Sequence, residues 1–207
     1  ADWRADALVV ALAPQARTPA AYRQTYIDAL APLAAALGNS LQRCVQVGST
    51  AVYGGDDGGW ADEDTPAAPS AWNGDLLLEA ERRAGECLPG LIRARCSGLY
   101  GPGRTWLWRR ALAGESGDAR WTNRIHVEDA AEALAHLLGC AQPAPSYCVT
   151  DDTPALEHEV LNGLRALQGL PPSLPAELVP RGRRISNARL RASGWRPRYP
   201  SWREGYA

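Results

Sequence analysis

The stretch Val45-Gln-Val-Gly-Ser-Thr-Ala-Val-Tyr-Gly54 is an apolar run that ends in two small hydroxyl residues and a tyrosine-glycine turn. A short apolar run bounded by turn residues is typical of a strand buried on both faces of a parallel sheet. Ligands in open α/β sheets bind just beyond the carboxyl ends of such strands. We therefore expect Ser49 and Thr50 to face a ligand crevice.

A second stretch, Leu91-Ile-Arg-Ala-Arg-Cys-Ser-Gly-Leu-Tyr-Gly-Pro-Gly-Arg104, repeats this pattern. Its apolar run breaks into a turn with three glycines and a proline, which are residues that end strands and shape loops. The two stretches together predict two strand ends that meet at one edge of a sheet.

Strand-like and helix-like segments alternate outward from these stretches, which predicts an α/β fold with a doubly wound parallel sheet and helices on both faces. We expect a large core at 1–150 and a small C-terminal lobe at 151–207, and 98–123 is compatible with either part. Loops are expected at 54–71 and 169–175. The expected strands are 7–14, 42–48, 90–96 and 146–150, with a short extended piece at 123–127. The expected helices are 19–37, ended by Gly38, then 73–87, 104–113, 128–139 and 154–168.

Composition narrows the class of function. The net charge of −1 argues against nucleic acid and against a membrane surface as partners, and no apolar run is long enough to span a bilayer. Five cysteines without a C-x-x-C pair and three histidines without matching spacing predict inert thiols, no metal site and a cytoplasmic protein. All 22 basic residues are Arg, so lysine chemistry is excluded, and the absence of Met leads us to expect that the natural start lies upstream.

Three motifs occur in an order and spacing that resemble the NAD-dependent epimerase/dehydratase branch of the short-chain dehydrogenase/reductases. They are Gly48-Ser-Thr-Ala-Val-Tyr-Gly54, Gly98-Leu-Tyr-Gly-Pro-Gly-Arg104 and Arg124-Ile-His-Val-Glu-Asp129. The likeness extends over nearly the whole chain, through Trp121-Thr-Asn-Arg124, Tyr147-Cys-Val-Thr-Asp151, Ser186-Asn-Ala-Arg-Leu190 and Gly194-Trp-Arg-Pro197.

The resemblance implies an NAD(P)-binding Rossmann-like sheet, with NAD or NADP as cofactor and a small, possibly sugar-nucleotide, substrate. It also implies a homodimer through helices 19–37 and 73–87. The sequence contains no G-x-G-x-x-G turn to hold a pyrophosphate, and 7–14 is similar to the family's fourth strand. At about 30 residues per βαβ unit, on the order of 60 residues of the family's fold are expected to be missing at the front, so cofactor binding by this chain should be weak or absent.

The resemblance also assigns catalytic positions. Ser49, with Thr50 beside it, matches the hydroxyl residue that contacts the reacting group, although either hydroxyl could simply satisfy backbone at the strand end. Ala71 and Asp75 fall where the family has its catalytic tyrosine and lysine, so the pair is expected to be absent, as in the atypical subgroup. Tyr53 is a candidate replacement acid, and packing beneath the turn is its simpler interpretation.

Further residues are expected to contact ligands. The candidate cofactor contacts are Ala11, Leu12, Ala13, Val47 and Gly48, and the candidate substrate contacts are Tyr100, Arg104, Arg124 and His126. Small residues let a cofactor approach the backbone, and arginine offers a fork of donors to a phosphate or carboxylate. Apolar packing explains the first set equally well, Arg104 could be a solvated surface residue, and the simpler interpretation of His126 is a structural one.

Three functional hypotheses remain open from the sequence. The first is an atypical NAD(P)-dependent epimerase/dehydratase or oxidoreductase. The second is a non-catalytic ligand-binding or regulatory protein that retains the fold. The third is a fragment without independent activity, which should aggregate or dimerise through its exposed sheet edge.

Overall fold

The computed structural model describes residues 5–37, 40–174 and 179–206, and its main feature is a parallel sheet. Within these residues the largest sheet has the strand order β1-β2-β4-β8, and each neighbouring pair is parallel. The strands are β1 (Ala7–Val10), β2 (Arg43–Ser49), β4 (Leu91–Cys96) and β8 (Ser146–Val149). The predicted α/β class and parallel sheet are confirmed.

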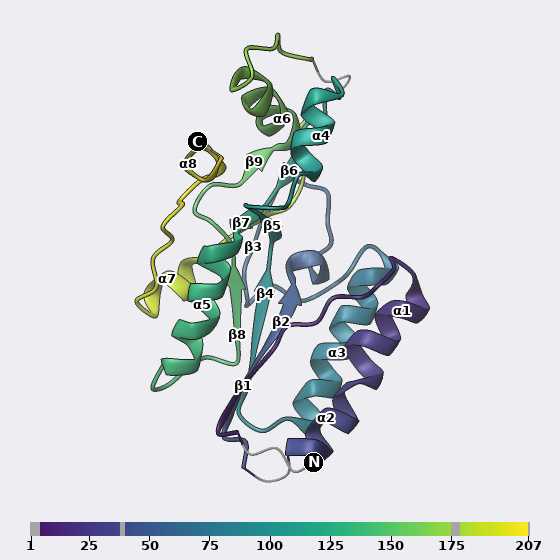
Figure 1. Ribbon diagram of the computed structural model, residues 1–207, viewed down its shortest axis with the longest axis vertical. Coiled ribbons are helices and arrows are strands. Elements are labelled where there is room, and N and C mark those ends of the chain that lie inside the picture. The colour runs from purple at the N-terminus through teal and green to yellow at the C-terminus, as the bar shows by residue number, and fades with distance from the viewer. Residues whose placement is uncertain (1–4, 38–39, 175–178, 207) are drawn as a thin grey trace.

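Helices cover both faces of this sheet (Figure 1). One face carries α1 (Pro19–Arg23), a π-helix (Gln24–Asp28), α2 (Leu30–Leu37) and α3 (Trp72–Cys87), and the other carries α5 (Val127–Gly139) and α7 (Ala188–Ala192).

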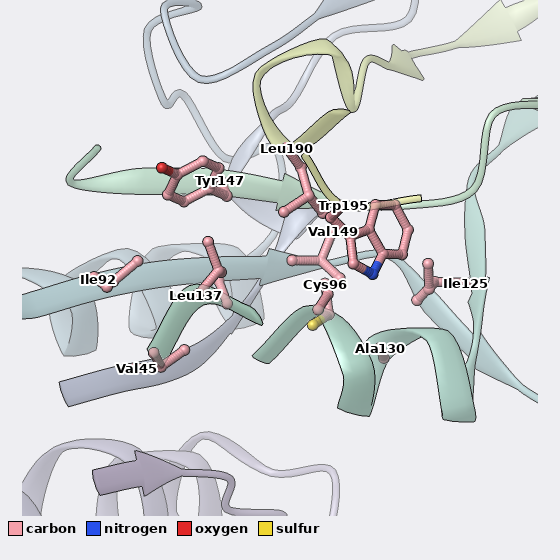
Figure 2. Packing of buried hydrophobic residues seen from close by; sticks show 12 residues of the cluster. Val45, Ile92, Cys96, Ile125, Ala130, Leu137, Tyr147, Val149, Leu190 and Trp195 are labelled. Carbon is pink, nitrogen blue, oxygen red and sulfur yellow. The ribbon is translucent and has the colours of Figure 1, made fainter. Parts of the chain in front are cut away.

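Two buried clusters join the layers. On the α5 face, Val45 and Ile92 of the sheet pack with Leu137 of α5, and Leu190 and Trp195 complete the cluster (Figure 2). On the α3 face the cluster consists of Val10, Leu30, Leu37, Leu41, Cys44, Ala84 and Leu88. Because the strands contribute buried side chains to both clusters, their sequences are apolar runs rather than alternating patterns.

The segment expected as one helix at 19–37 is made of three consecutive helical pieces. Thr18 caps its start by accepting a hydrogen bond from the backbone N–H of Ala21 at 3.3 Å, and Pro19 stands at the first helical position. The middle piece is the π-helix, which the amphipathic pattern did not reveal. Gly38, the expected terminator, lies outside the described residues.

Short strands form a second layer of structure beyond the carboxyl ends of β2 and β4 (Figure 1). They form three small sheets. One pairs β5 (Gly98–Tyr100) with β7 (Arg124–His126), and another pairs β3 (Trp60–Ala61) with β11 (Arg184–Ile185). In the third, β6 (Arg120–Thr122) lies between β9 (Ala155–Leu156) and β10 (Arg181–Gly182). The helices here are α4 (Trp106–Leu112), α6 (Glu157–Ala166) and α8 (Trp202–Gly205).

Two sequence expectations about this region were wrong in detail. The expected loop 54–71 contains β3, because Trp60 and Ala61 pair with distant residues of β11. The helix expected at 154–168 begins only at Glu157, because Ala155 and Leu156 pair with β6 as a strand. The loop expected at 169–175 has no regular structure over 169–174, and Pro175 lies outside the described residues.

A close approach of α3 to the end of β2 depends on Gly74. A Cβ atom at Gly74 would lie 2.5 Å from the carbonyl oxygen of Ala51 and 2.7 Å from Cβ of Pro69. We expect Gly74→Ala to lower the free energy of unfolding by about 1–3 kcal/mol, because the helix must move away from the turn that follows β2. Urea denaturation measures this change.

Gly85, in the same helix, provides the matched control. A Cβ atom there would come nearest to Nη2 of Arg93, at 2.9 Å, which is the end of a flexible side chain. Gly85→Ala should therefore raise the free energy of unfolding by about 0.5–1 kcal/mol through helix propensity. Equal effects of the two substitutions would contradict the close approach at Gly74.

Candidate substrate and cofactor site

Two cavities adjoin at the carboxyl edge of the sheet, where Thr122 and Asn123 line both. We call the larger one, of about 480 Å³, the aromatic cavity, and the smaller one, of about 290 Å³, the polar cavity. The aromatic cavity is lined by Gly98, Leu99, Tyr100, Gly103, Arg104, Thr105, Trp106, Leu107, Arg109, Thr122, Asn123, Arg124, Glu157, Val160 and Tyr206. The polar cavity is lined by Ser49, Thr50, Ala51, Tyr53, Gly55, Ser70, Arg120, Trp121, Thr122, Asn123, Arg183 and Ile185.

Ser49 and Thr50 lie where the sequence placed them, at the end of β2. Oγ of Ser49 accepts a hydrogen bond from the backbone N–H of Ala51 at 3.1 Å, so it also caps the 3₁₀ turn at Thr50–Val52. The hydroxyl oxygens of Thr50 and Ser97 lie 3.5 Å apart. Ser49 and Thr50 both line the polar cavity, so their hydroxyl groups can exchange hydrogen bonds with an oxygen atom of a bound ligand.

Tyr53 has a hydroxyl group that is already engaged inside the protein. It accepts a hydrogen bond from Nη1 of Arg95 at 2.5 Å and lies 3.7 Å from Sγ of Cys148. Burial raises the pKa of Tyr53, which disfavours the phenolate. The hydroxyl is therefore fixed to an interior arginine, an arrangement that agrees with packing beneath the turn.

Arg95 belongs to a buried ion pair that the sequence did not reveal. Its Nε donates to Oε1 of Glu81 at 3.0 Å and its Nη2 donates to Oε2 at 2.7 Å. Glu81 reaches this position because Gly48 has no side chain: a Cβ atom on Gly48 would lie 3.0 Å from Oε1 of Glu81. The space beside Gly48 is thus occupied by a carboxylate of α3.

The other candidate cofactor contacts lie along β1 and β2. Val47 packs against the buried cluster on the α5 face. Ala11, Leu12 and Ala13 follow β1 and are exposed, and the described linings of the two cavities do not include them. Their small or exposed side chains leave the backbone accessible at the carboxyl end of β1, which fits the approach of a dinucleotide there.

The structure brings Tyr100, Arg104 and Arg124 together on the aromatic cavity and places His126 on an adjoining hollow. Nδ1 of His126 accepts a hydrogen bond from the backbone N–H of Glu128 at 3.3 Å, which caps α5. Its ring centroid lies 4.1 Å from that of Tyr199. His126 lines a neighbouring hollow of about 390 Å³ that shares Arg104 with the aromatic cavity.

Arg124 is buried at the base of the aromatic cavity, with 4 % of its surface exposed. Its Nη2 donates to Oγ1 of Thr122, and its Nη1 has no hydrogen-bond partner in the described part of the structure. The hydroxyl of Tyr206 and Oδ2 of Asp151 are likewise buried without a partner among the described residues. Burial raises the pKa of Asp151 to about 8 and lowers that of Arg124.

The positions that the family resemblance assigns to the catalytic tyrosine and lysine lie at the start of α3. Ala71 is the residue before the first turn, and Asp75 is exposed within that turn. Trp72, between them, contacts Tyr22 edge to face at a centroid distance of 5.0 Å. The side chains of Ala71 and Trp72 carry no group that can act as a general acid or base.

Several lining residues were not singled out from the sequence. Asn123 lines both cavities, and its side chain fixes the backbone of a distant segment beside them. Its Nδ2 donates to the carbonyl oxygen of Arg183 at 2.8 Å, and its Oδ1 accepts from the N–H of Ile185 at 2.8 Å. Only the motif Trp121-Thr-Asn-Arg124 hinted at it. Tyr206 and Glu157 carried no local signal, because they reach the cavity from distant parts of the chain.

Metal clusters and membrane-spanning helices are absent from the described ranges. No cluster of three or more His, Cys, Asp or Glu side chains able to hold a metal ion occurs there, and the five cysteines are free thiols. None of the helices in those ranges is long and apolar enough to cross a membrane.

Comparison with known proteins identifies relatives. No protein-family model matches the chain. The chain is 34% identical over 180 residues to a 3-diazoavenalumate denitrifying reductase from Streptomyces sp., a match that covers 70% of this chain and 57% of that protein, so the chain spans little more than half of this curated relative.

Solved structures extend the match. A putative NAD-dependent epimerase/dehydratase from Methylobacillus flagellatus is 36% identical, with a TM-score of 0.83, over 97% of this chain and 74% of that chain. MoeE5, solved in complex with UDP-glucose and NAD, shares the fold at 24% identity and a TM-score of 0.79, over 97% of this chain and 76% of its own. The level of identity and coverage, together with the Rossmann-like parallel sheet, shows that this chain belongs to the NAD-dependent epimerase/dehydratase family.

Proposed function

We propose that the chain is the substrate-binding and catalytic part of an NAD(P)-dependent oxidoreductase that acts on a small molecule held across the two cavities. The observation that carries this proposal is the position of Ser49 and Thr50: both hydroxyl groups line the polar cavity, which adjoins the larger aromatic cavity at Thr122 and Asn123. The reductase named among the relatives and the NAD-bound structural neighbour support a redox reaction.

In this proposal, different parts of the fold contact the cofactor and the substrate. Residues 1–150 would supply the cofactor side, with Ala11 and Ala13 exposed at the end of β1, and 151–207 would close the substrate side through Glu157, Val160 and Tyr206. The segment 98–123 contributes to the substrate side through Tyr100 and Arg104. The bound nucleotide, NAD or NADP, supplies or accepts hydride.

The protein's own groups then have defined tasks. Ser49 and Thr50 hydrogen-bond the oxygen of the reacting carbon and hold it in place, and Arg104 and Arg124 attract an anionic group of the substrate. The apolar walls of the aromatic cavity exclude water from the rest of the substrate. Hydride transfer at the reacting carbon is accompanied by proton transfer at its oxygen. Ser49 or Thr50 would pass this proton to or from solvent water, in place of a tyrosine-lysine pair.

Ser49→Ala is expected to lower the rate of NAD(P)H oxidation by 10-fold or more, because a hydrogen bond to the reacting oxygen is lost. The substitution is made in a longer form of the chain that includes a G-x-G-x-x-G turn, with any substrate that this form turns over. The decrease in NAD(P)H absorbance measures the rate, and calorimetric titration of NAD(H) and NADP(H) measures cofactor binding.

Ser186→Ala is the matched control. Oγ of Ser186 also accepts a hydrogen bond from a backbone N–H two residues on, that of Ala188 at 3.2 Å, but Ser186 lies on neither cavity's described lining. The two variants should lose similar stability, and only Ser49→Ala should lose turnover. Equal turnover by both variants would remove Ser49 from the mechanism.

The competing proposal is a binding protein that has lost catalysis. The exposed Asp75 and the Ala71 position at the start of α3 favour it, because neither residue supplies the family's acid. Cofactor or substrate binding without turnover, in the wild type and in Ser49→Ala alike, would establish this alternative.

A further inference from the structure

The charge and shape of the aromatic cavity restrict what it can bind. Its walls carry the rings of Tyr100, Trp106 and Tyr206, together with the apolar side chains Leu99, Leu107 and Val160. A cavity with such walls favours a flat, apolar body, because aromatic rings stack or meet edge to face.

The charges that remain available in this cavity are positive. Among the described residues, Glu157 is the only one with a carboxylate that lines this cavity. It is already bound by Nη1 of Arg110 and by the backbone N–H of Asp118 at 3.1 Å. Arg104 and Arg109 form no ion pair with any described residue. An anionic ligand would therefore meet unpaired guanidinium groups.

Two buried donors at the base of the cavity lack acceptors. Nη1 of Arg124 and the hydroxyl of Tyr206 make no hydrogen bond with the residues that the structure describes. A buried donor without an acceptor is unfavourable, so a ligand oxygen that accepts from it is bound strongly. Burial raises the pKa of Asp151 to about 8, which favours the neutral carboxyl group and reduces the negative charge beside Arg124.

A sugar nucleotide suits this cavity poorly. The hydroxyl groups of a hexose need donors and acceptors along the whole ring. In this cavity the carboxylate of Glu157, the amide of Asn123 and the hydroxyl of Thr122 already make hydrogen bonds with other residues. A carboxylate on a planar unsaturated body places its oxygens at the arginine and its apolar part against the rings.

We propose that the aromatic cavity binds a planar, unsaturated or aromatic carboxylate, with its carboxylate on Arg124 and its body against Tyr100, Trp106 and Tyr206. This inference takes one point from the proposed function, namely that the substrate binds in the aromatic cavity.

Calorimetric titration with trans-cinnamate, its uncharged amide and UDP-glucose tests the inference without cofactor. Cinnamate should bind at least 10-fold more tightly than cinnamamide and more tightly than UDP-glucose. Arg124→Gln should weaken cinnamate binding by 10-fold or more and leave cinnamamide binding nearly unchanged. Arg82→Gln, which removes an arginine of α3 that is 57 % exposed and lies off this cavity, should change cinnamate binding less than 3-fold.

Trp106→Ala is a second variant that leaves the buried Arg124 in place, so the test does not depend on whether Arg124→Gln folds. The side chain of Trp106 is 59 % exposed, so its removal leaves the core intact, and it should weaken the binding of cinnamate and cinnamamide alike. The inference is overturned if cinnamate does not bind, if it binds no better than its amide, or if UDP-glucose binds more tightly. It is also overturned if either a folded Arg124→Gln variant or Trp106→Ala leaves cinnamate binding unchanged.

The outcomes separate this inference from the proposed function. Binding of NAD(P)H with turnover, but without cinnamate binding, would overturn the carboxylate assignment alone. Binding of cinnamate without any binding or oxidation of NAD(P)H, by a longer form of the chain that includes a G-x-G-x-x-G turn, would overturn the oxidoreductase proposal and retain the carboxylate site.

Discussion

Glu81→Ala is expected to lower the free energy of unfolding by about 3–5 kcal/mol, because it leaves the guanidinium of Arg95 buried without its partner. The side chain of Glu81 is 3 % exposed and that of Arg95 is 10 % exposed, so solvent does not replace the lost carboxylate. The loss should also release the hydroxyl of Tyr53, which Arg95 holds at 2.5 Å. Urea denaturation followed by circular dichroism measures the change.

Glu79→Ala is the matched control on the same helix. Glu79 pairs with Arg23 at 3.0 Å, and the two side chains are 29 % and 49 % exposed. An exposed ion pair of this kind contributes about 0–1 kcal/mol, so the control should stay close to the wild type. Similar losses at Glu79 and Glu81 would show that burial does not set the strength of the Glu81–Arg95 pair.

Trp202→Ala should lower the free energy of unfolding by a similar amount, about 3–5 kcal/mol. Trp202 is 4 % exposed and packs with Val160, Leu161 and Leu164 of α6. Its ring lies against the backbone of Gly163, where a Cβ atom would be 2.1 Å from Cη2 of the indole. Removal of the indole leaves a cavity between α6 and α8, and thermal or urea denaturation measures its cost.

Trp60→Ala controls for residue type. Trp60 is 53 % exposed on β3 and contacts the guanidinium of Arg184 at 5.0 Å from the ring centroid. Loss of an exposed contact between a cation and a ring costs up to about 1 kcal/mol. If Trp60→Ala destabilised the protein as much as Trp202→Ala, the packing against Gly163 would not be the source of the effect.

The parallel sheet could be predicted because its strands carry their signal locally. The apolar runs of β2 and β4 end in turn residues, and α3 has a clear amphipathic pattern, so these elements were placed to within one or two residues. The family motifs likewise pointed to Ser49 and Arg124, which line the two cavities at the carboxyl edge of the sheet.

The parts that were not predicted depend on pairing over long distances. The two-residue strands β3 and β11 exist only because they pair with each other, and neither is long enough to show an alternating pattern. The same holds at the site. Glu81 lies in α3 and Arg95 in β4, and neither stands in a motif that marks it in the sequence. Their contact follows from the packing of α3 on the sheet. Nδ1 of His126 caps α5, which agrees with the structural interpretation of this residue, and its contact with a substrate stays a prediction.

The all-parallel order of the main sheet has a consequence for how fast the chain folds. Parallel neighbours require a crossover between them, and the pairing of β4 with β8 joins segments separated by β5, α4, β6, β7 and α5. The entropy of closing such long connections is lost before the strand contacts form, so a high contact order slows the search for the native state. Refolding of this chain should therefore be slow compared with helical bundles of similar stability, and β8 should join the sheet after β2 and β4 have paired.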